Sequence, residues 1–357
     1  MKKPFGLFSD PHFHAWSSFS EDDPDGVSLR LRGLLGELKR CAEETRKAGG
    51  NRIYCGGDVF HTRGQVSPLV LNPVLDTLTE LTERGFEFRI ISGNHDLARR
   101  DSERLSSAVT ALETEAVEIV NATEVFTDDK VAMIPWYDKV SSLHAEIVRV
   151  AELLGPNVGE YTLIIHAPVN GVIQGLPDTG IDPAWLAERG FKRILSGHYH
   201  NYKQFPGEVY SIGALAHHTW SDVGTKAGFL LVHDDTVKFF KSHLPEFLDL
   251  DQLAEFESED VPLMVDGNYV RVKTEKSAHS EIEAIRAELI SWGAKGVLIR
   301  SMPKARVTRE GGVSASVSGG ASIFKSVEHY IAAQAFSDKK AVNDACARIL
   351  SVAGVSL

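Results

Sequence analysis

Short apolar runs alternate with longer amphipathic segments along the amino-terminal half of the chain. The short runs are rich in β-branched and aromatic residues and predict buried strands, whereas apolar residues spaced three and four apart predict helices. The expected strands are 5–9, 53–55, 86–92, 131–134, 161–165 and 193–196, and the expected helices are 28–47, 68–84, 140–154 and 183–188. This order of elements predicts an α/β fold.

Two of the expected helices carry a continuous apolar face. Ser28 is the expected N-cap of the helix 28–47, and Gly85 ends the helix 68–84. The residues expected to be buried are Leu31, Leu34, Leu35 and Leu38 in the first helix, and Leu71, Leu75, Leu78 and Leu81 in the second.

The pattern changes in the second half of the chain. Strands at 209–212, 228–232 and 237–240 follow one another without helices, so residues 1–251 are expected to form the core domain. Strands at 261–271 and 296–300 flank a helix at 279–292, which predicts a small β-α-β domain over 252–303. Residues 311–322 are rich in Gly and Ser, so 304–322 is predicted to be a flexible linker. Two apolar stripes predict helices within 323–357.

Composition narrows the class of protein. The chain has 357 residues, of which 43% are hydrophobic and 24% charged, as in an ordinary globular protein. The net charge of −11 excludes a protein that simply coats nucleic acid through a basic surface. Three distant cysteines predict neither a disulfide framework nor a zinc knuckle, and no apolar run is long enough for a membrane span. We therefore expect a cytoplasmic protein without a membrane partner.

Polar residues with metal-ligand chemistry follow several expected strands. Asp10 and His12 come after the first strand, and alternation would place His14 on the same side if the chain stayed extended. Asp58 follows Gly56-Gly57 after the second strand, and Gly93-Asn94-His95-Asp96 follows the third. A capping turn would use the Asn or the Asp of this tetrapeptide but has no need of the His.

Histidines end two later strands in the same way. His166 follows 161–165, and His198 and His200 follow 193–196. Two four-coordinate metal shells need eight ligands, which seven residues supply if one carboxylate bridges. Such a pair of metals activates water for attack on phosphorus, so the set predicts phosphoester hydrolysis with manganese, iron or zinc. The seven candidate ligands are Asp10, His12, Asp58, Asn94, His166, His198 and His200.

The ordered motifs D-x-H, GD, GNHD, H and GHxH resemble those of the calcineurin-like metallophosphoesterases over about residues 5 to 240. Gly57-Asp58-Val59-Phe60-His61 is similar to the GD-x-F-H of the SbcD and Mre-type nucleases of DNA double-strand-break repair. The resemblance implies a two-sheet β-sandwich flanked by helices, with a small α/β capping domain and C-terminal helices.

The resemblance also implies roles for single residues. Asp10, His12 and His200 would hold one metal, Asn94, His166 and His198 the other, and Asp58 would bridge them. His95 would protonate the leaving oxygen, Asp96 would orient its ring, and His61 would contact the phosphate. The implied metals are two Mn²⁺ ions, with Fe²⁺, Zn²⁺ or Mg²⁺ as alternatives.

The implied function is a DNA exonuclease and endonuclease that acts on double-stranded ends and on single strands. The implied partners are a second copy of the chain and an SbcC-type ATPase, whose coiled coil would receive residues 323–357. The alternatives are a small-molecule phosphodiesterase or phosphatase on the same core, a non-catalytic scaffold of this fold, and, for 252–303, a generic α/β appendage. Two departures from the family are Phe13-His14 after D-x-H and Gly213-Ala214 in place of Gly-Ser. The pair His217-His218 has no motif around it, and we assign it no chemical role.

Overall fold

A computed structural model describes most of the chain and divides it into two compact units, Met1–Met302 and Pro303–Leu357. The described residues are 3–98, 108–252, 259–274, 278–301, 327, 330–332 and 338–352. We describe each unit by itself.

The first sheet of the larger unit has six strands in the order β12-β11-β1-β2-β3-β4. Its four parallel strands are β1 (Phe5–Phe8), β2 (Arg52–Cys55), β3 (Glu87–Ile91) and β4 (Val117–Val120). The hairpin of β11 (Gly228–His233) and β12 (Thr236–Lys241) extends it antiparallel to β1. The hairpin closes this sheet without a helix, as the sequence predicts, but the strand expected at 209–212 belongs to the other sheet.

The second sheet also has six strands, in the order β5-β6-β7-β8-β10-β9. They are β5 (Glu124–Phe126), β6 (Val131–Ile134), β7 (Thr162–His166), β8 (Arg193–Gly197), β9 (Lys203–Phe205) and β10 (Val209–Ser211). Leu7, Tyr54 and Ile91 of the first sheet share one buried cluster with Ile164 and Leu195 of the second. The two sheets thus pack face to face as a sandwich, with their apolar inner faces forming the central core.

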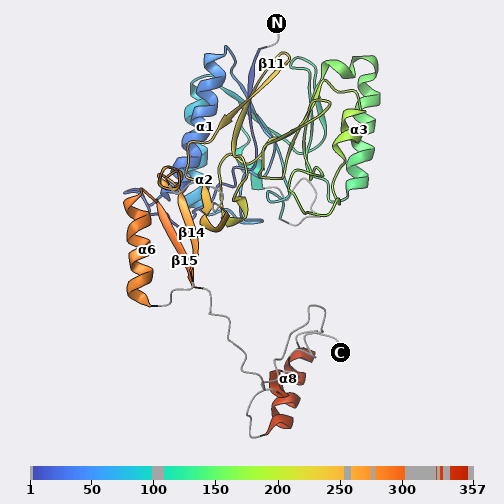
Figure 1. The fold of residues 1–357 in the computed structure, drawn as a ribbon. Helices are drawn as coiled ribbons and strands as arrows, with labels where there is room; N and C mark the ends of the chain where they lie inside the picture. Colours follow the sequence, from blue (N-terminus) through green and yellow to red (C-terminus); the bar gives the residue numbers. More distant parts are fainter. Residues whose placement is uncertain are drawn as a thin grey trace. The chain divides into compact units, whose positions relative to one another are not determined.

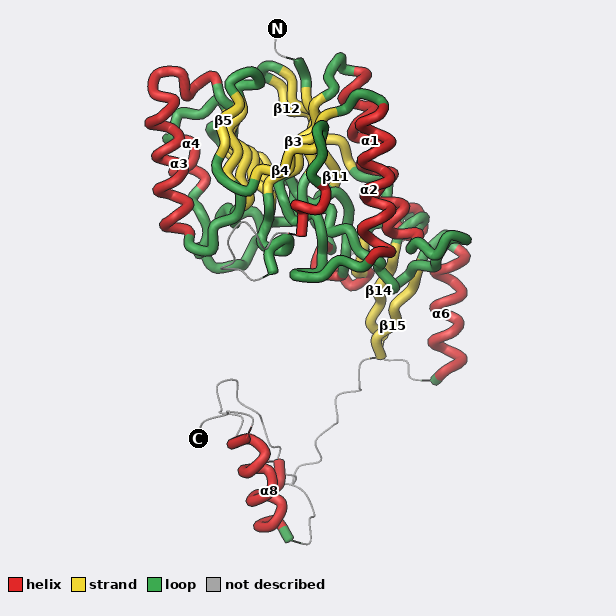
Figure 2. The backbone as a smooth tube through the Cα atoms, turned by 180° about the vertical axis from the view of Figure 1, so that it is seen from behind, coloured by secondary structure: helices red, strands yellow, loops and turns green. Residues whose placement is uncertain are grey.

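Helices cover the two outer faces of the sandwich, with α1 and α2 on one side and α3 on the other (Figure 1; Figure 2). They are α1 (Leu29–Lys47), α2 (Pro68–Glu83), α3 (Val140–Leu154) and the short α4 (Pro183–Ala187), with 3₁₀ turns at Ala108–Leu112, Gly155–Glu160, Trp220–Asp222 and Leu250–Gln252. This confirms the predicted mixed α/β fold with two sheets flanked by helices.

Two local predictions about the helices hold only in part, since Ser28 is at the expected N-cap and Leu78 and Leu81 are buried. Ser28 is at the N-cap position of α1, but its hydroxyl makes no capping bond and donates to the carbonyl of Trp16 instead. In α2 the fully buried face includes Val70 and Val74, while Leu71 and Leu75 are only partly buried. The α2 face is therefore rotated from the one that leucine spacing alone predicts.

A three-stranded parallel sheet forms a smaller part of the same unit. It consists of β13 (Phe247–Asp249), β14 (Tyr269–Thr274) and β15 (Gly296–Ser301), with the helices α5 (Val261–Val265) and α6 (His279–Ser291). The strand predicted at 261–271 is confirmed only at its end, in β14. Its first part is wrong, because Pro262 lies in the first turn of α5 and Gly267, with a φ of 77°, separates α5 from β14. β13 comes before residue 251, so this sheet starts inside the expected core domain.

The second unit contains α8 (Lys339–Val352). The linker predicted at 304–322 lies outside the described residues, as does Phe324 of the predicted first stripe. Among the described helices, none is long and apolar enough to cross a membrane.

Candidate metal centre

The candidate ligands lie in loops that follow β1, β2, β3 and β8, and at the last residue of β7. Each of these strands belongs to the parallel part of its sheet. Parallel strands end at the same edge, and ligand sites of α/β proteins lie at that carboxyl edge. Packing of the two sheets therefore brings together residues that are up to 190 positions apart, from Asp10 to His200.

One half of the centre consists of Asp10, His12 and His200, whose ligand atoms all lie within 4.8 Å of one another. The Nε2 atoms of His12 and His200 are 3.1 Å apart. Asp10 is completely buried, and one carboxylate oxygen accepts a hydrogen bond of 2.5 Å from Ser9 Oγ.

The other half consists of Asp58, His166 and His198, again within 4.8 Å, with Asn94 between the two imidazoles. Asn94 Oδ1 is 2.8 Å from His198 Nδ1 and 3.2 Å from His166 Nε2. His166 Nδ1 is 2.7 Å from the Gly56 carbonyl. Since Nδ1–H donates to that carbonyl, Nε2 of His166 is the ring nitrogen that faces the centre.

Asp58 reaches both halves with its two carboxylate oxygens. Oδ2 is 3.6 Å from His12 Nε2, and Oδ1 is 3.5 Å from His166 Nε2. A single carboxylate in this position has the geometry of a bridge between two ions.

The chemistry of these residues fits two divalent metals. Asp10 and Asp58 are buried, and within the described part of the chain neither pairs with a Lys or Arg. Burial lowers the pKa of His198 to about 3, so its ring is neutral and free to ligate. Asp58 raises the pKa of His166 to about 9 against the effect of burial, so His166 would lose its Nε2 proton when a metal binds. Buried carboxylates without a cation are costly, and a mixture of oxygen and imidazole donors suits a borderline transition metal.

Four of the candidate ligands have left-handed backbone conformations. The φ angles are 47° at Asp10, 41° at His12, 53° at Asp58 and 98° at His198. Such angles are uncommon outside glycine and concentrate at functional sites, where packing enforces them. They also break the expected alternation: His14 does not join the ligand clusters, and its Nδ1 lies 3.4 Å from Thr62 Oγ1.

Two further histidines predicted for the site lie beside the first half. His12, His61 and His95 bring ring nitrogens within 4.8 Å of one another, and the rings of His61 and His95 stack at 5.7 Å. The prediction for Asp96 differs from the structure. Asp96 accepts hydrogen bonds from the backbone amides of Phe60 and Gly93, while His95 Nδ1 lies 2.8 Å from the His61 carbonyl. That carbonyl orients the His95 ring.

Sequence reasoning missed three residues that contact the centre. Asp222 accepts a hydrogen bond of 2.7 Å from His200 Nδ1, and His218 Nε2 lies 2.9 Å from the Asp10 carbonyl. Trp136 stacks on His198 with ring centroids 5.2 Å apart. Sequence reasoning assigns no role to His218, whereas in the structure it contacts the loop that carries Asp10. The Thr219-x-x-Asp222 capping box was the only local signal for Asp222, and it indicates a turn.

Comparisons with known proteins extend this picture. A family model described as calcineurin-like phosphoesterase matches residues 3–202, which is more than half of the chain. A search of curated proteins gives no match. Among solved structures, a dimetal phosphatase from Danio rerio is similar with 10% identity and a TM-score of 0.39, over 65% of this chain and 92% of that one.

Proposed function

Because the chain belongs to the calcineurin-like phosphoesterase family, it is a metal-dependent hydrolase of phosphoesters, and we propose that its substrate is DNA. The proposed activity is cleavage of phosphodiester bonds at DNA ends, as exonuclease and endonuclease. We propose Mn²⁺ as the resident metal, with Fe²⁺, Zn²⁺ and Mg²⁺ as alternatives.

The placement of His61 supports this proposal most directly. His61 is the last residue of Gly57-Asp58-Val59-Phe60-His61, the segment that resembles the nuclease motif GD-x-F-H. Its ring lies 5.4 Å from that of His12 and stacks with that of His95. The residue that distinguishes the nuclease motif is thus at the metal centre, where it would contact a phosphate.

Each half of the centre would hold one ion. The first ion would be bound by Asp10, His12 and His200, and the second by Asn94, His166 and His198. Asp58 would bind both. When bound, the metals supply activation of the attacking water and positive charge for the phosphoryl oxygens.

His95 is the proposed general acid. Because Nδ1–H donates to the His61 carbonyl, proton transfer takes place from Nε2. The ring must therefore be an imidazolium at the start of the step, and it becomes neutral as the 3′ or 5′ oxygen leaves. Asp58 Oδ1 accepts the His95 backbone N–H at 2.7 Å, which fixes this loop to the bridging carboxylate.

We also propose partners. The amphipathic helix α8 and the residues around it, 323–357, would dock on the coiled coil of an SbcC-type ATPase, and the nuclease would act as a homodimer. In a pull-down with such an ATPase, deletion of 323–357 is expected to abolish capture. Full capture after deletion would contradict this assignment.

The nuclease proposal is tested by incubating the full chain and Mn²⁺ with labelled linear duplex DNA, beside bis-p-nitrophenyl phosphate. Degradation of DNA that is lost in Asp58→Ala and His95→Gln is the expected result. Hydrolysis of the small ester with DNA left intact, even with the ATPase added, would contradict the DNA assignment and favour a small-molecule phosphodiesterase.

A further inference from the structure

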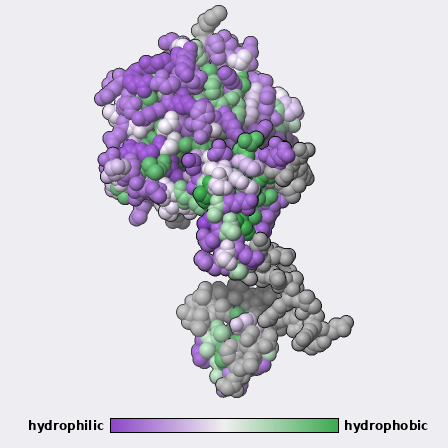
Figure 3. Space-filling model, turned by 60° about the vertical axis from the view of Figure 1, so that its left-hand side comes forward, coloured by the Kyte–Doolittle hydropathy of each residue, from purple (hydrophilic) through white to green (hydrophobic). Residues whose placement is uncertain are grey.

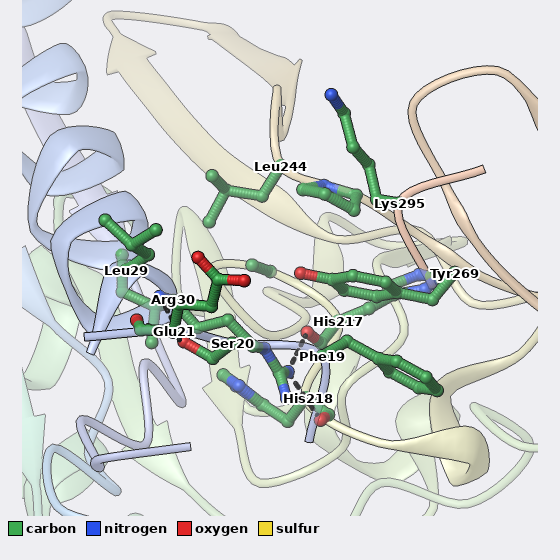
Figure 4. A pocket seen from close by; sticks show the side chains of 13 residues that line it. Phe19, Ser20, Glu21, Leu29, Arg30, His217, His218, Leu244, Tyr269 and Lys295 are labelled. Carbon is green, nitrogen blue, oxygen red and sulfur yellow. Dashed lines mark hydrogen bonds between the residues drawn. The ribbon is translucent and has the colours of Figure 1, made fainter. Parts of the chain in front are cut away.

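A separate cavity of about 480 Å³ lies where the core meets the three-stranded sheet. Figure 3 shows hydrophobic surface gathered at this junction. The walls come from Phe19, Leu34 and Leu244 and from Tyr269 of β14. Figure 4 shows Phe19, Leu244 and Tyr269 around an open centre. This volume is within the range of small-molecule sites, which are often found at such junctions.

The aromatic wall of the cavity is closely packed. Phe19 stacks on Tyr269 with centroids 5.1 Å apart and planes at 18°. Phe19 has a φ of 56°, which is a strained conformation for so bulky a residue. A Cβ on Gly296 would lie 2.3 Å from the Phe19 ring, so the glycine is needed for this packing.

Arg30 lines the floor of the cavity and is held there by hydrogen bonds and by neighbouring aromatic rings. Its guanidinium donates to the carbonyls of His217 and His218, and it lies 5.5 Å from the Tyr269 ring and 5.1 Å from the Trp16 ring. His218 also contacts the Asp10 loop, so a single residue separates the cavity floor from the metal centre.

Three polar groups of the cavity have no partner among the described residues. Tyr269 is only 6% exposed, yet its hydroxyl points into the open centre without a hydrogen bond. The carboxylate of Glu21 and the ammonium of Lys295, both exposed at the rim, are also unpaired in the part of the chain that the structure describes. The cavity therefore presents a hydroxyl, a carboxylate and an ammonium that are open to solvent or to a ligand.

We propose that this cavity binds a nucleobase, and that guanine matches it best. A planar base would pack against the aromatic and aliphatic walls, as bases do on aromatic side chains in single-strand-binding proteins. Guanine presents two adjacent N–H donors, which suit the Glu21 carboxylate, and the acceptors O6 and N7, which suit an ammonium and a hydroxyl. No phosphate or metal takes part in this recognition, so the inference stands apart from the nuclease proposal.

The test uses guanosine, which lacks a phosphate and so avoids the metal centre, in calorimetric titration of the full metal-free chain. One guanosine is expected to bind per chain, more tightly than adenosine, cytidine or thymidine. Tyr269→Phe is expected to weaken binding about fivefold and Glu21→Gln more than tenfold, which correspond to a neutral and a charged hydrogen bond. Glu113→Gln, an exposed carboxylate on another loop, is the matched control and is expected to bind like the wild type.

Failure of guanosine to bind, equal binding of all four nucleosides, or wild-type affinity in both cavity variants would overturn the proposal. Unchanged melting temperatures would separate lost binding from misfolding. Competition by a short single strand identifies the source of the base: displacement of guanosine by a guanine-containing strand, and not by a guanine-free one, would assign the cavity to DNA. Binding of guanosine without such displacement would assign it to a free nucleoside or nucleotide.

Discussion

Asp222 Oδ1 lies 2.7 Å from His200 Nδ1, and Asp222 is buried with 2% of its surface exposed. Its other oxygen accepts the backbone N–H groups of His218 and Thr219 at 2.7 and 2.9 Å. The carboxylate thus holds the proton of His200 on Nδ1 and leaves Nε2 for a metal. Carboxylates of this kind raise the basicity of ligating histidines and fix their orientation.

Asp222→Asn is therefore expected to weaken one of the two metal sites by about 10- to 100-fold. The amide would donate to Nδ1 and shift the ring proton to Nε2, while its oxygen would still accept the backbone amides. Binding of Mn²⁺ to the metal-free protein, followed by electron paramagnetic resonance of the free ion, should resolve one weakened site. Ser221→Ala, in the same turn but without contact to His200, is the control. Two intact sites in Asp222→Asn would disprove the role.

Removal of the metals should destabilise the core. Asp10 and Asp58 are buried beside several imidazoles, and bound cations would stabilise their negative charge. Each ion present at 100 times its Kd contributes about 2.7 kcal/mol, so EDTA is expected to lower the Tm by roughly 5 °C or more. Asp58→Asn should melt at nearly the same temperature with and without EDTA. Equal EDTA shifts in the variant and the wild type would contradict the bridging position.

Much of the fold follows from local sequence. The run that ends at Phe8 and the one that ends at Cys55 both have strand composition and both lead to a ligand loop. Such patterns are readable because strand propensity and the position of polar residues after a strand are local properties. The segment Val261–Val265 shows where this fails, since its β-branched residues favour a strand while Pro262 and the following Gly267 produce a short helix.

Residues around the ligands are harder to predict. Asp222 contacts His200, which is 22 residues away in the sequence, and Trp136, just after β6, stacks on His198. Neither contact follows from the hydrophobic periodicity of a helix or a strand. The direction of the His14 side chain depends on the positive φ angles at Asp10 and His12. The pattern of polar and apolar residues does not predict these angles, because Asp and His usually have negative φ. Tertiary packing decides these contacts.

Gly57→Ala should disrupt the centre more than an equivalent change elsewhere. Gly57 has a φ of 99°, and an added Cβ would lie 2.6 Å from His166 Nδ1 and 2.9 Å from the Gly93 nitrogen. Gly85 has a similar φ of 85° but no atom within 4 Å of such a Cβ. Both alanines incur a conformational cost of about 1–2 kcal/mol, which cancels in the comparison. Urea denaturation should show a larger loss for Gly57→Ala, together with weaker Mn²⁺ binding. Equal losses of stability in the two variants would show that the loop adjusts without displacing His166.

His95→Gln should slow the chemical step without loss of metal. The Gln side chain retains hydrogen-bonding capacity but cannot protonate a leaving oxygen, so kcat on DNA is expected to fall by about 10²- to 10⁴-fold. The fall should be much smaller on bis-p-nitrophenyl phosphate, since p-nitrophenolate leaves readily without a proton. Binding of Mn²⁺ should stay near the wild-type level, because the residues assigned to the two metal sites do not include His95, although its ring nitrogen lies within 4.8 Å of those of His12 and His61. An equal fall on both substrates would mean that His95 stabilises the phosphoryl group instead of the leaving oxygen.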